Sequence, residues 1–238
     1  MLETKCSTMT DLKKIHAHLI KSGLIKDKIA ASRVLALSAK SPPNGDINYA
    51  NLVFTQIENP NLFSWNTIIR GFSESSIPQY AIHLFIEMFN TSEVQPFLLT
   101  YPSVFKAYAR HGLAKDGAQL HGRIIKLDLE FNTFIRNTLL HMYVSHGFFI
   151  EARKLFDENE VEDLVSWNSM IMGLAKSGEI DYSWRSHGNI ALSRWSAEHL
   201  LELDPNESIG YVLMANMYAA SGQFEEAMDE RIPLKENI

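Results

Sequence analysis

The chain has 238 residues, of which 46% are hydrophobic and 21% are charged, with 12 glycines and 8 prolines. This composition is typical of a globular protein and excludes a disordered or fibrous chain. No stretch approaches the roughly 18 consecutive apolar residues of a bilayer-spanning helix, so we expect no membrane partner. The single cysteine, Cys6, excludes an internal disulfide and a thiolate-rich zinc site.

The charge is divided unevenly along the chain. Residues 1–150 include 15 basic and 11 acidic residues, a net charge of +4, whereas residues 151–238 include 7 basic and 17 acidic residues, a net charge of −10. The total of −6, if spread evenly, would argue against a nucleic-acid partner, because phosphate contacts need a basic surface. The uneven division instead predicts that the two ends bind different partners.

The predicted elements are helices that come in repeated pairs. Apolar residues recur at spacings of three and four almost everywhere and alternating β-branched runs are few, so we expect an all-α protein. Residues 61–71 match residues 163–173, with an identical Ser-Trp-Asn core displaced by 102 residues. Two further copies, containing Pro102 and Asn137, divide this displacement into steps of 36, 35 and 31 residues. An earlier copy contains Ser32 and fits after a three-residue insertion.

Each copy has a second half that contains a small residue, usually followed by a Leu-Phe pair three and four positions later. The small residues are Ala50, Ala81, Gly117 and Ala152. Glycines that favour a left-handed helix end stand where the first helix of a copy should stop, at Gly112, Gly147 and Gly178. Each copy therefore predicts two antiparallel helices of roughly 12 residues, which must stack on their neighbours to complete a core.

The period near 35, the Ser-Trp-Asn-x-x-Ile head, the Ala-x-x-Leu-Phe second helix and the Val-Gln-Pro closure at residues 94–96 resemble the pentatricopeptide repeat family. The resemblance implies a right-handed α-solenoid of antiparallel helix-turn-helix repeats. The rotation of unit lengths is similar to the plant subclass that mixes normal, long and short repeats. Residues 184–238 resemble the tetratricopeptide-like extension motif (E motif) that follows the repeats in that subclass.

The resemblance divides the chain into seven segments. A partial long-type repeat precedes short, normal, long, short and truncated repeats and the extension helices, with the boundaries 1–27, 28–61, 62–97, 98–132, 133–163, 164–183 and 184–238. The truncated repeat has Ser183, Ser186 and His187 where the small residue and the Leu-Phe pair should stand. We therefore expect a deletion between about Asp181 and Trp184 relative to longer relatives, as in a shortened gene model or splice form.

In this family one repeat reads one RNA base, and the resemblance assigns the reading to two positions of each repeat. The fifth residue faces the base, and the fifth residues are Ser32, Asn66, Pro102, Asn137 and Asn168. The last residue assists it, and the last residues are Asn61, Phe97, Asn132 and Asp163.

The residue types at these two positions resemble particular base readers. An amide offers a donor and an acceptor to a pyrimidine edge, whereas a serine hydroxyl leaves room for a purine. Ser32 with Asn61 resembles an adenine reader, and Asn137 with Asp163 resembles a uracil reader. The pair of Asn66 with Phe97 favours a pyrimidine, and the long repeat, with Pro102 and Asn132, gives no base assignment.

The second residue of each repeat resembles the family's position between successive bases. The second residues are Ile29, Phe63, Leu99, Phe134 and Val165. Stacking of an aromatic side chain on a base contributes on the order of 1–3 kcal/mol. The residues alone leave alternatives open, because Phe63 and Phe134 also fit core positions, and Asn66, Asn137 and Asn168 also fit caps or hydrogen bonds within helices.

The nine histidines do not indicate a metal site. His16 and His18 are two positions apart, and His141 and His146 are five apart, whereas helical zinc ligands stand four apart. Longer relatives carry a cytidine-deaminase-like (DYW) domain that needs His-x-Glu and Cys-x-x-Cys to hold zinc, and neither motif occurs in this sequence. We therefore expect no enzyme activity, no cofactor and no small-molecule substrate.

The resemblance implies an RNA-binding adaptor of a mitochondrion or chloroplast. The repeats would select a site on an organellar transcript for processing, above all C-to-U RNA editing, and the acidic C-terminal helices would recruit a deaminase supplied in trans. Two alternatives stay open: a scaffold that binds only protein, and a shortened fragment without function, because four or five readable bases give weak specificity. The organelle rests on the resemblance, since the residues after Met1 lack the Arg- and Ser-rich composition of a transit peptide, which longer relatives would carry upstream.

Overall fold

The computed structural model describes residues 8–40, 45–91, 93–158, 165–166 and 169–170. Across this described part every regular element is a helix and none is a strand. The all-α fold expected from the sequence is therefore confirmed. The chain forms two compact units, Met1–Met142 and Tyr143–Ile238.

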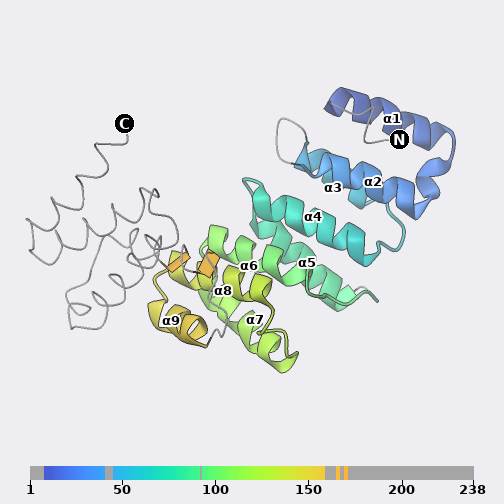
Figure 1. The fold of residues 1–238 in the computed structure, drawn as a ribbon. Coiled ribbons are helices and arrows are strands. Elements are labelled where there is room, and N and C mark those ends of the chain that lie inside the picture. Colours follow the sequence, from blue (N-terminus) through green and yellow to red (C-terminus); the bar gives the residue numbers. More distant parts are fainter. Residues whose placement is uncertain (1–7, 41–44, 92, 159–164, 167–168, 171–238) are drawn as a thin grey trace, which may run out of the picture. The chain divides into compact units, whose positions relative to one another are not determined.

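The helices follow one another closely along the chain (Figure 1). Those of the first unit are α1 (Met9–Lys21), the 3-10 helix η1 (Leu24–Lys26), α2 (Lys28–Ser38), α3 (Ile47–Phe54), α4 (Leu62–Glu74), α5 (Gln79–Thr91), α6 (Thr100–His111) and α7 (Ala114–Lys126). Helix α8 (Thr133–Ser145) runs across the boundary between the units, and α9 (Phe149–Asp157) belongs to the second unit.

Helices of the first unit form pairs that stack on one another. Helix α2 contacts α3, α4 contacts α5, and α6 contacts α7. The first helices of successive pairs also contact one another, α2 with α4 and α4 with α6, and α5 packs on α6 (Figure 1). Because a single pair cannot bury its apolar face, this stacking gives the continuous core that the repeated sequence predicts.

Acidic side chains fix where two of the helices begin. The Asp27 carboxylate accepts hydrogen bonds from the backbone N–H groups of Ile29 and Ala30, at 2.8 and 2.9 Å, at the start of α2. The Asp46 carboxylate caps α3 in the same way. Such bonds satisfy backbone donors that the first turn of a helix leaves without a partner within the helix.

Two of the three predicted glycine helix ends lie in the described residues, and both are confirmed. Gly112 follows α6 with a φ of 81°, and its N–H bonds the carbonyl of Tyr108. Gly147 lies just beyond α8 with a φ of 75°. The third, Gly178, lies outside the described residues.

Gly112→Ala is expected to lower the free energy of unfolding by about 1–2 kcal/mol, because a Cβ in the left-handed region crowds the backbone. Gly122→Ala is the matched control, since a Cβ added there meets nothing within 4 Å and the position lies inside α7. This control should raise the free energy of unfolding by about 0.5–1 kcal/mol. Urea unfolding of the full chain measures both changes, and equal effects would contradict this account of the helix end.

The small residues of the second helices lie in the core. Ala50, Ala81, Gly117 and Ala152 are all buried. A Cβ added at Gly117 would overlap the sulfur of Met142, which α8 places against α7. The small residue at this position therefore lets two neighbouring helices approach closely, as the sequence predicts.

Aromatic pairs join one repeat to the next. Phe54 at the end of α3 packs edge-on against Trp65 of α4, with ring centroids 4.8 Å apart. Phe85 of α5 packs against Tyr101 of α6 in the same manner, with centroids 6.1 Å apart. In both pairs the partner is the fourth residue of the following repeat. Phe54, which follows Val53, and Phe85, which follows Leu84, are both buried core residues.

Candidate nucleic-acid interface

An exposed apolar residue stands at the second position of every repeat. The exposed fractions are 66% for Ile29, 56% for Phe63, 69% for Leu99, 63% for Phe134 and 57% for Val165. Ile29 lies in the first turn of α2, Phe63 in that of α4 and Phe134 in that of α8, whereas Leu99 directly precedes α6. Exposing a large apolar side chain is unfavourable in water, so its recurrence at one position of the repeat makes these residues candidates for contact with a ligand.

Phe63 and Phe134 lie outside the core, unlike their neighbours in the same helices. In α4, Trp65 is 4% exposed and Ile68 is fully buried. In α8, Ile135 is likewise fully buried. The faces of α4 and α8 that carry these phenylalanines therefore point away from the packed interior.

The readout residues of the first complete repeat, Ser32 and Asn61, meet at Ser64 of α4. Ser32 is 6% exposed, and its hydroxyl donates to the carbonyl of Lys28 at 2.6 Å and lies 3.2 Å from the Ser64 hydroxyl. Asn61 caps α4, because its Oδ1 accepts from the N–H and from the hydroxyl of Ser64, at 2.9 and 3.0 Å. The structure brings these two predicted residues together through a third.

The readout residues of the second repeat, Asn66 and Phe97, meet at Thr100 of α6. Oδ1 of the half-buried Asn66 accepts from the Thr100 hydroxyl at 2.7 Å. The backbone N–H of the exposed Phe97 donates to the same hydroxyl at 3.1 Å. Asn66 thus bonds across two helices rather than capping its own helix.

The long repeat has a different junction. Pro102 is buried in the first turn of α6 and has no donor to offer. Oδ1 of Asn132 accepts from the backbone N–H of Ile135 at 3.2 Å. Since Ile135 is apolar, no hydroxyl links Pro102 to Asn132 in this repeat.

The last predicted readout residues are only partly within the described residues. Asn137 is half-buried in α8. Asp163 and Asn168 lie outside the described residues, as do the segments 171–183 and 184–238, which include most of the truncated repeat and all of the extension helices.

Ser64 and Thr100 are not among the readout positions that the family resemblance assigns. The sequence carries a signal for them, because the third position of the repeats from residue 62 onward is Ser64, Thr100, Ile135 and Ser166 in order. The repeat at residues 28–61 has Ala30 at this position. Among the four later repeats, Ile135 alone lacks the hydroxyl, and it follows the repeat whose fifth residue is proline.

Two basic side chains of α6 form bonds with residues of α4, the first helix of the preceding repeat. Lys106 pairs with Glu74 at 3.3 Å on the exposed surface, and Arg110 donates to the backbone carbonyl of Ser73 at 2.6 Å. An exposed pair of this kind stabilises a fold by at most about 1 kcal/mol, so Lys106 can exchange Glu74 for another anion at little cost.

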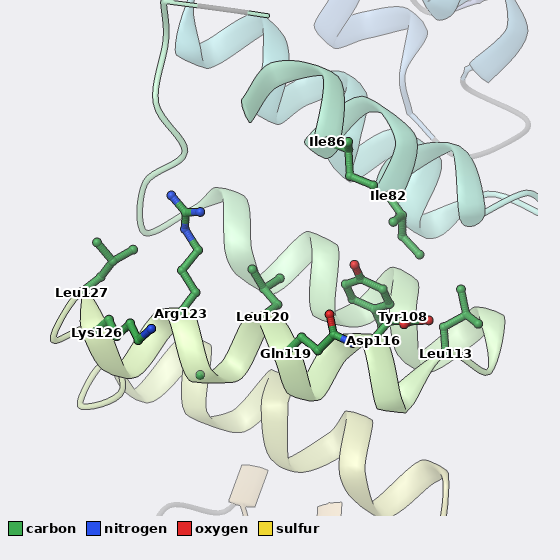
Figure 2. Close-up of a pocket in the computed structure, with 11 residues that line it drawn as sticks. Ile82, Ile86, Tyr108, Leu113, Asp116, Gln119, Leu120, Arg123, Lys126 and Leu127 are labelled. Carbon is green, nitrogen blue, oxygen red and sulfur yellow. The ribbon is translucent and has the colours of Figure 1, made fainter. Parts of the chain in front are cut away.

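A groove lies between the second helices α5 and α7 (Figure 2). Its volume is about 900 Å³, and Ile82 and Ile86 of α5 face Leu120 and Arg123 of α7 across it. The Arg123 guanidinium stacks on the ring of Phe89, 3.8 Å from its centroid. None of the predicted base-contacting residues lines this groove.

The described histidines do not build a metal site. His16 is buried and its Nδ1 lies 2.6 Å from the Tyr49 hydroxyl, whereas His18 is exposed, so the two rings point apart. Burial lowers the pKa of His16. Within the described residues, no three His, Cys, Asp or Glu side chains converge as metal ligands would. In the same part of the chain, no helix has the length and apolar character to cross a membrane.

Comparisons with known proteins agree with the repeat pattern. A family model described as PPR repeat matches residues 63–90, 134–158 and 165–185. A chloroplastic pentatricopeptide repeat-containing protein of Arabidopsis thaliana is 58% identical over 169 residues, which cover 71% of this chain and 30% of the relative. A mitochondrial one is 42% identical over 179 residues, which cover 74% of this chain and 26% of the relative. A second chloroplastic relative is 34% identical, with coverage of 74% and 38%. The chain thus spans between a quarter and two fifths of these relatives' lengths.

Proposed function

Because the chain belongs to the pentatricopeptide repeat family, we propose that it binds single-stranded organellar RNA and recognises a short sequence. The observation that carries the proposal is the exposed apolar residue at the second position of each repeat, three residues before the predicted base reader. Exposed aromatic and branched side chains at regular intervals are what a row of unstacked bases needs on the protein side.

The proposed recognition sequence follows the order of the repeats. Ser32 with Asn61 would take an adenine, Asn66 with Phe97 a pyrimidine, the long repeat any base, and Asn137 with Asp163 a uracil. Two of the relatives are named as chloroplastic proteins and one as a mitochondrial protein. We propose that this chain also acts in one of these organelles.

The proposed role in the cell is site recognition for RNA processing, with C-to-U editing as its most specific form. Residues 1–238 contain neither His-x-Glu nor Cys-x-x-Cys, and the proposal includes a deaminase that acts in trans. The net charge of −10 over residues 151–238 supports a basic protein partner at that end. The alternative is a scaffold that binds only protein, and the RNA-binding experiment described next distinguishes the two functions.

The full chain is expected to bind RNA with the order adenine, pyrimidine, any base, uracil more tightly than scrambled RNA, and Asn137→Ala should reduce the preference for uracil at the fourth base. One mismatched base typically costs about 1–3 kcal/mol, so the preference for uracil should fall by about 5- to 150-fold. Asn90→Ala, on an exposed site of the second helix α5, is the control and should change nothing.

Equilibrium binding measured by fluorescence anisotropy at two salt concentrations completes this test. Phosphate contacts should make the affinity fall as salt rises, whereas the preference for the matched sequence should persist. Equal binding to matched and scrambled RNA would reject sequence recognition and favour the protein scaffold.

A further inference from the structure

We propose that Ser64 and Thr100 are positioning residues, whose hydroxyls hold the two readout residues of the preceding repeat in one geometry. This inference rests on the proposed RNA-binding function and adds residues that the two readout positions do not include. Each hydroxyl belongs to the third position of one repeat and hydrogen-bonds both the fifth and the last residue of the repeat before it. The two readout residues of one repeat are therefore bonded to the third residue of the next repeat.

At the first junction the Ser64 hydroxyl lies within hydrogen-bonding distance of both readout residues. The Ser32 hydroxyl donates to the Lys28 carbonyl at 2.6 Å, and either serine can be the donor in the contact between the two hydroxyls. The Ser64 oxygen is 3.2 Å from the Ser32 oxygen and 3.0 Å from Oδ1 of Asn61. Ser64 therefore ties the side chains of both readout residues to the start of α4.

At the second junction the direction of the hydrogen bonds fixes the amide of Asn66. The Thr100 hydroxyl accepts from the Phe97 N–H at 3.1 Å and gives its proton to Oδ1 of Asn66 at 2.7 Å. With Oδ1 held by Thr100, the Nδ2 amino group forms the opposite edge of the amide. Asn66 would then offer N–H donors to a base, which favours a base edge that presents acceptors.

The long repeat supports the assignment by its contrast. Its fifth residue is Pro102, which needs no partner for an amide or hydroxyl, and the third residue of the following repeat is the buried Ile135. There Asn132 accepts from the backbone N–H of Ile135, as Asn61 does from that of Ser64, but the third residue has no hydroxyl to add a second bond. A hydroxyl at the third position thus accompanies a polar reader in the preceding repeat, and an apolar residue accompanies a reader without a polar side chain.

The experiment compares three variants of the full chain on four RNAs that differ only in the base aligned with Asn66. Thr100→Val removes the hydroxyl at nearly constant volume, whereas Thr100→Ser keeps a hydroxyl. Thr67→Val is the control, because it removes a buried hydroxyl that bonds only within its own helix, to the Phe63 carbonyl at 2.7 Å. Thr100→Val is expected to reduce the preference among the four bases about three- to tenfold, as the loss of one hydrogen bond predicts. Thr100→Ser and Thr67→Val should keep the preference of the unsubstituted chain.

The outcomes separate this inference from the function on which it rests. An unsubstituted chain that binds all four RNAs equally overturns both the base readout and the inference. A base preference that survives Thr100→Val in a chain that melts normally overturns the positioning role alone.

A second pair of variants covers the case in which Thr100→Val fails to fold. Ser64→Ala should reduce the preference at the base aligned with Ser32 by a similar factor, and Ser38→Ala, which removes a buried hydroxyl bonded only to Val34 and Leu35 carbonyls, should not. The same preference in both serine variants overturns the positioning role at this junction.

Discussion

Replacing Phe63 and Phe134 together by alanine is expected to weaken binding to the matched RNA on the order of a hundredfold or more. Both side chains are more than half exposed and lie at the second position of their repeats, where each would stack on bases. Each aromatic–base contact contributes on the order of 1–3 kcal/mol. The long repeat at residues 98–132 separates the two phenylalanines, so their losses of binding free energy should add. Binding of the full chain to labelled RNA measures the change.

The fold should survive this double substitution, because neither phenylalanine contributes to the core. The midpoint of thermal unfolding is expected to stay within a degree or two of the unsubstituted chain, as for most exposed substitutions. Phe131→Ala is the matched control, since Phe131 is 73% exposed just before α8 but lies outside the second position of any repeat. If the double variant bound matched RNA as tightly as the Phe131→Ala control, the proposal that Phe63 and Phe134 stack on bases would be wrong.

The sequence alone could predict the features that depend on short spacings. Gly112 and Gly147 mark helix ends, and Ala81 and Gly117 mark close approaches, because capping and small-residue packing follow from residues a few positions apart. The exposed position of Phe63 also follows from its place in the repeat once the repeat is aligned. These signals recur in each copy, so one copy supports the next.

The sequence could not predict contacts that depend on how two repeats meet. The bonds from Ser32 to Ser64 and from Asn66 to Thr100 join residues 32 and 34 positions apart. Ser32, which the resemblance assigns to a base, is 6% exposed in the protein alone, because α4 packs over it and places the Ser64 hydroxyl 3.2 Å from its own. Spacing within a repeat predicts which face of a helix carries a side chain. It does not predict how far the neighbouring helix buries a short side chain on that face.

The basic residues show the same limit in another form. A positive charge in the sequence is equally consistent with a phosphate contact and with packing. Arg123 stacks on Phe89 in the groove of the second helices, and Arg110 bonds a backbone carbonyl. Whether a basic side chain packs within the protein or is free for a phosphate depends on the neighbouring helix. For Arg123, α5 supplies the Phe89 ring on which the guanidinium stacks.

Trp65→Ala is expected to lower the free energy of unfolding by about 3–5 kcal/mol, because it opens a large cavity between two repeats. Trp65 is 4% exposed and packs edge-on against Phe54, which is 5% exposed. A repeat protein has contacts only between neighbours, so losing the contact of α3 with α4 weakens the link between the repeats on either side. Chemical unfolding of the full chain, followed by circular dichroism, measures the loss.

Trp65→Phe should cost much less than Trp65→Ala, and the difference tests whether packing or hydrogen bonding keeps the tryptophan in place. Trp65 Nε1 is buried and makes no hydrogen bond to the described residues, so the indole N–H contributes no bond that phenylalanine would lose. Phenylalanine retains an aromatic face for Phe54, and removing an unsatisfied donor offsets part of the lost volume. Leu52→Ala, 61% exposed on α3, controls for nonspecific effects and should stay within about 0.5 kcal/mol. If Trp65→Phe were as damaging as Trp65→Ala, the indole N–H rather than the aromatic packing would join these repeats.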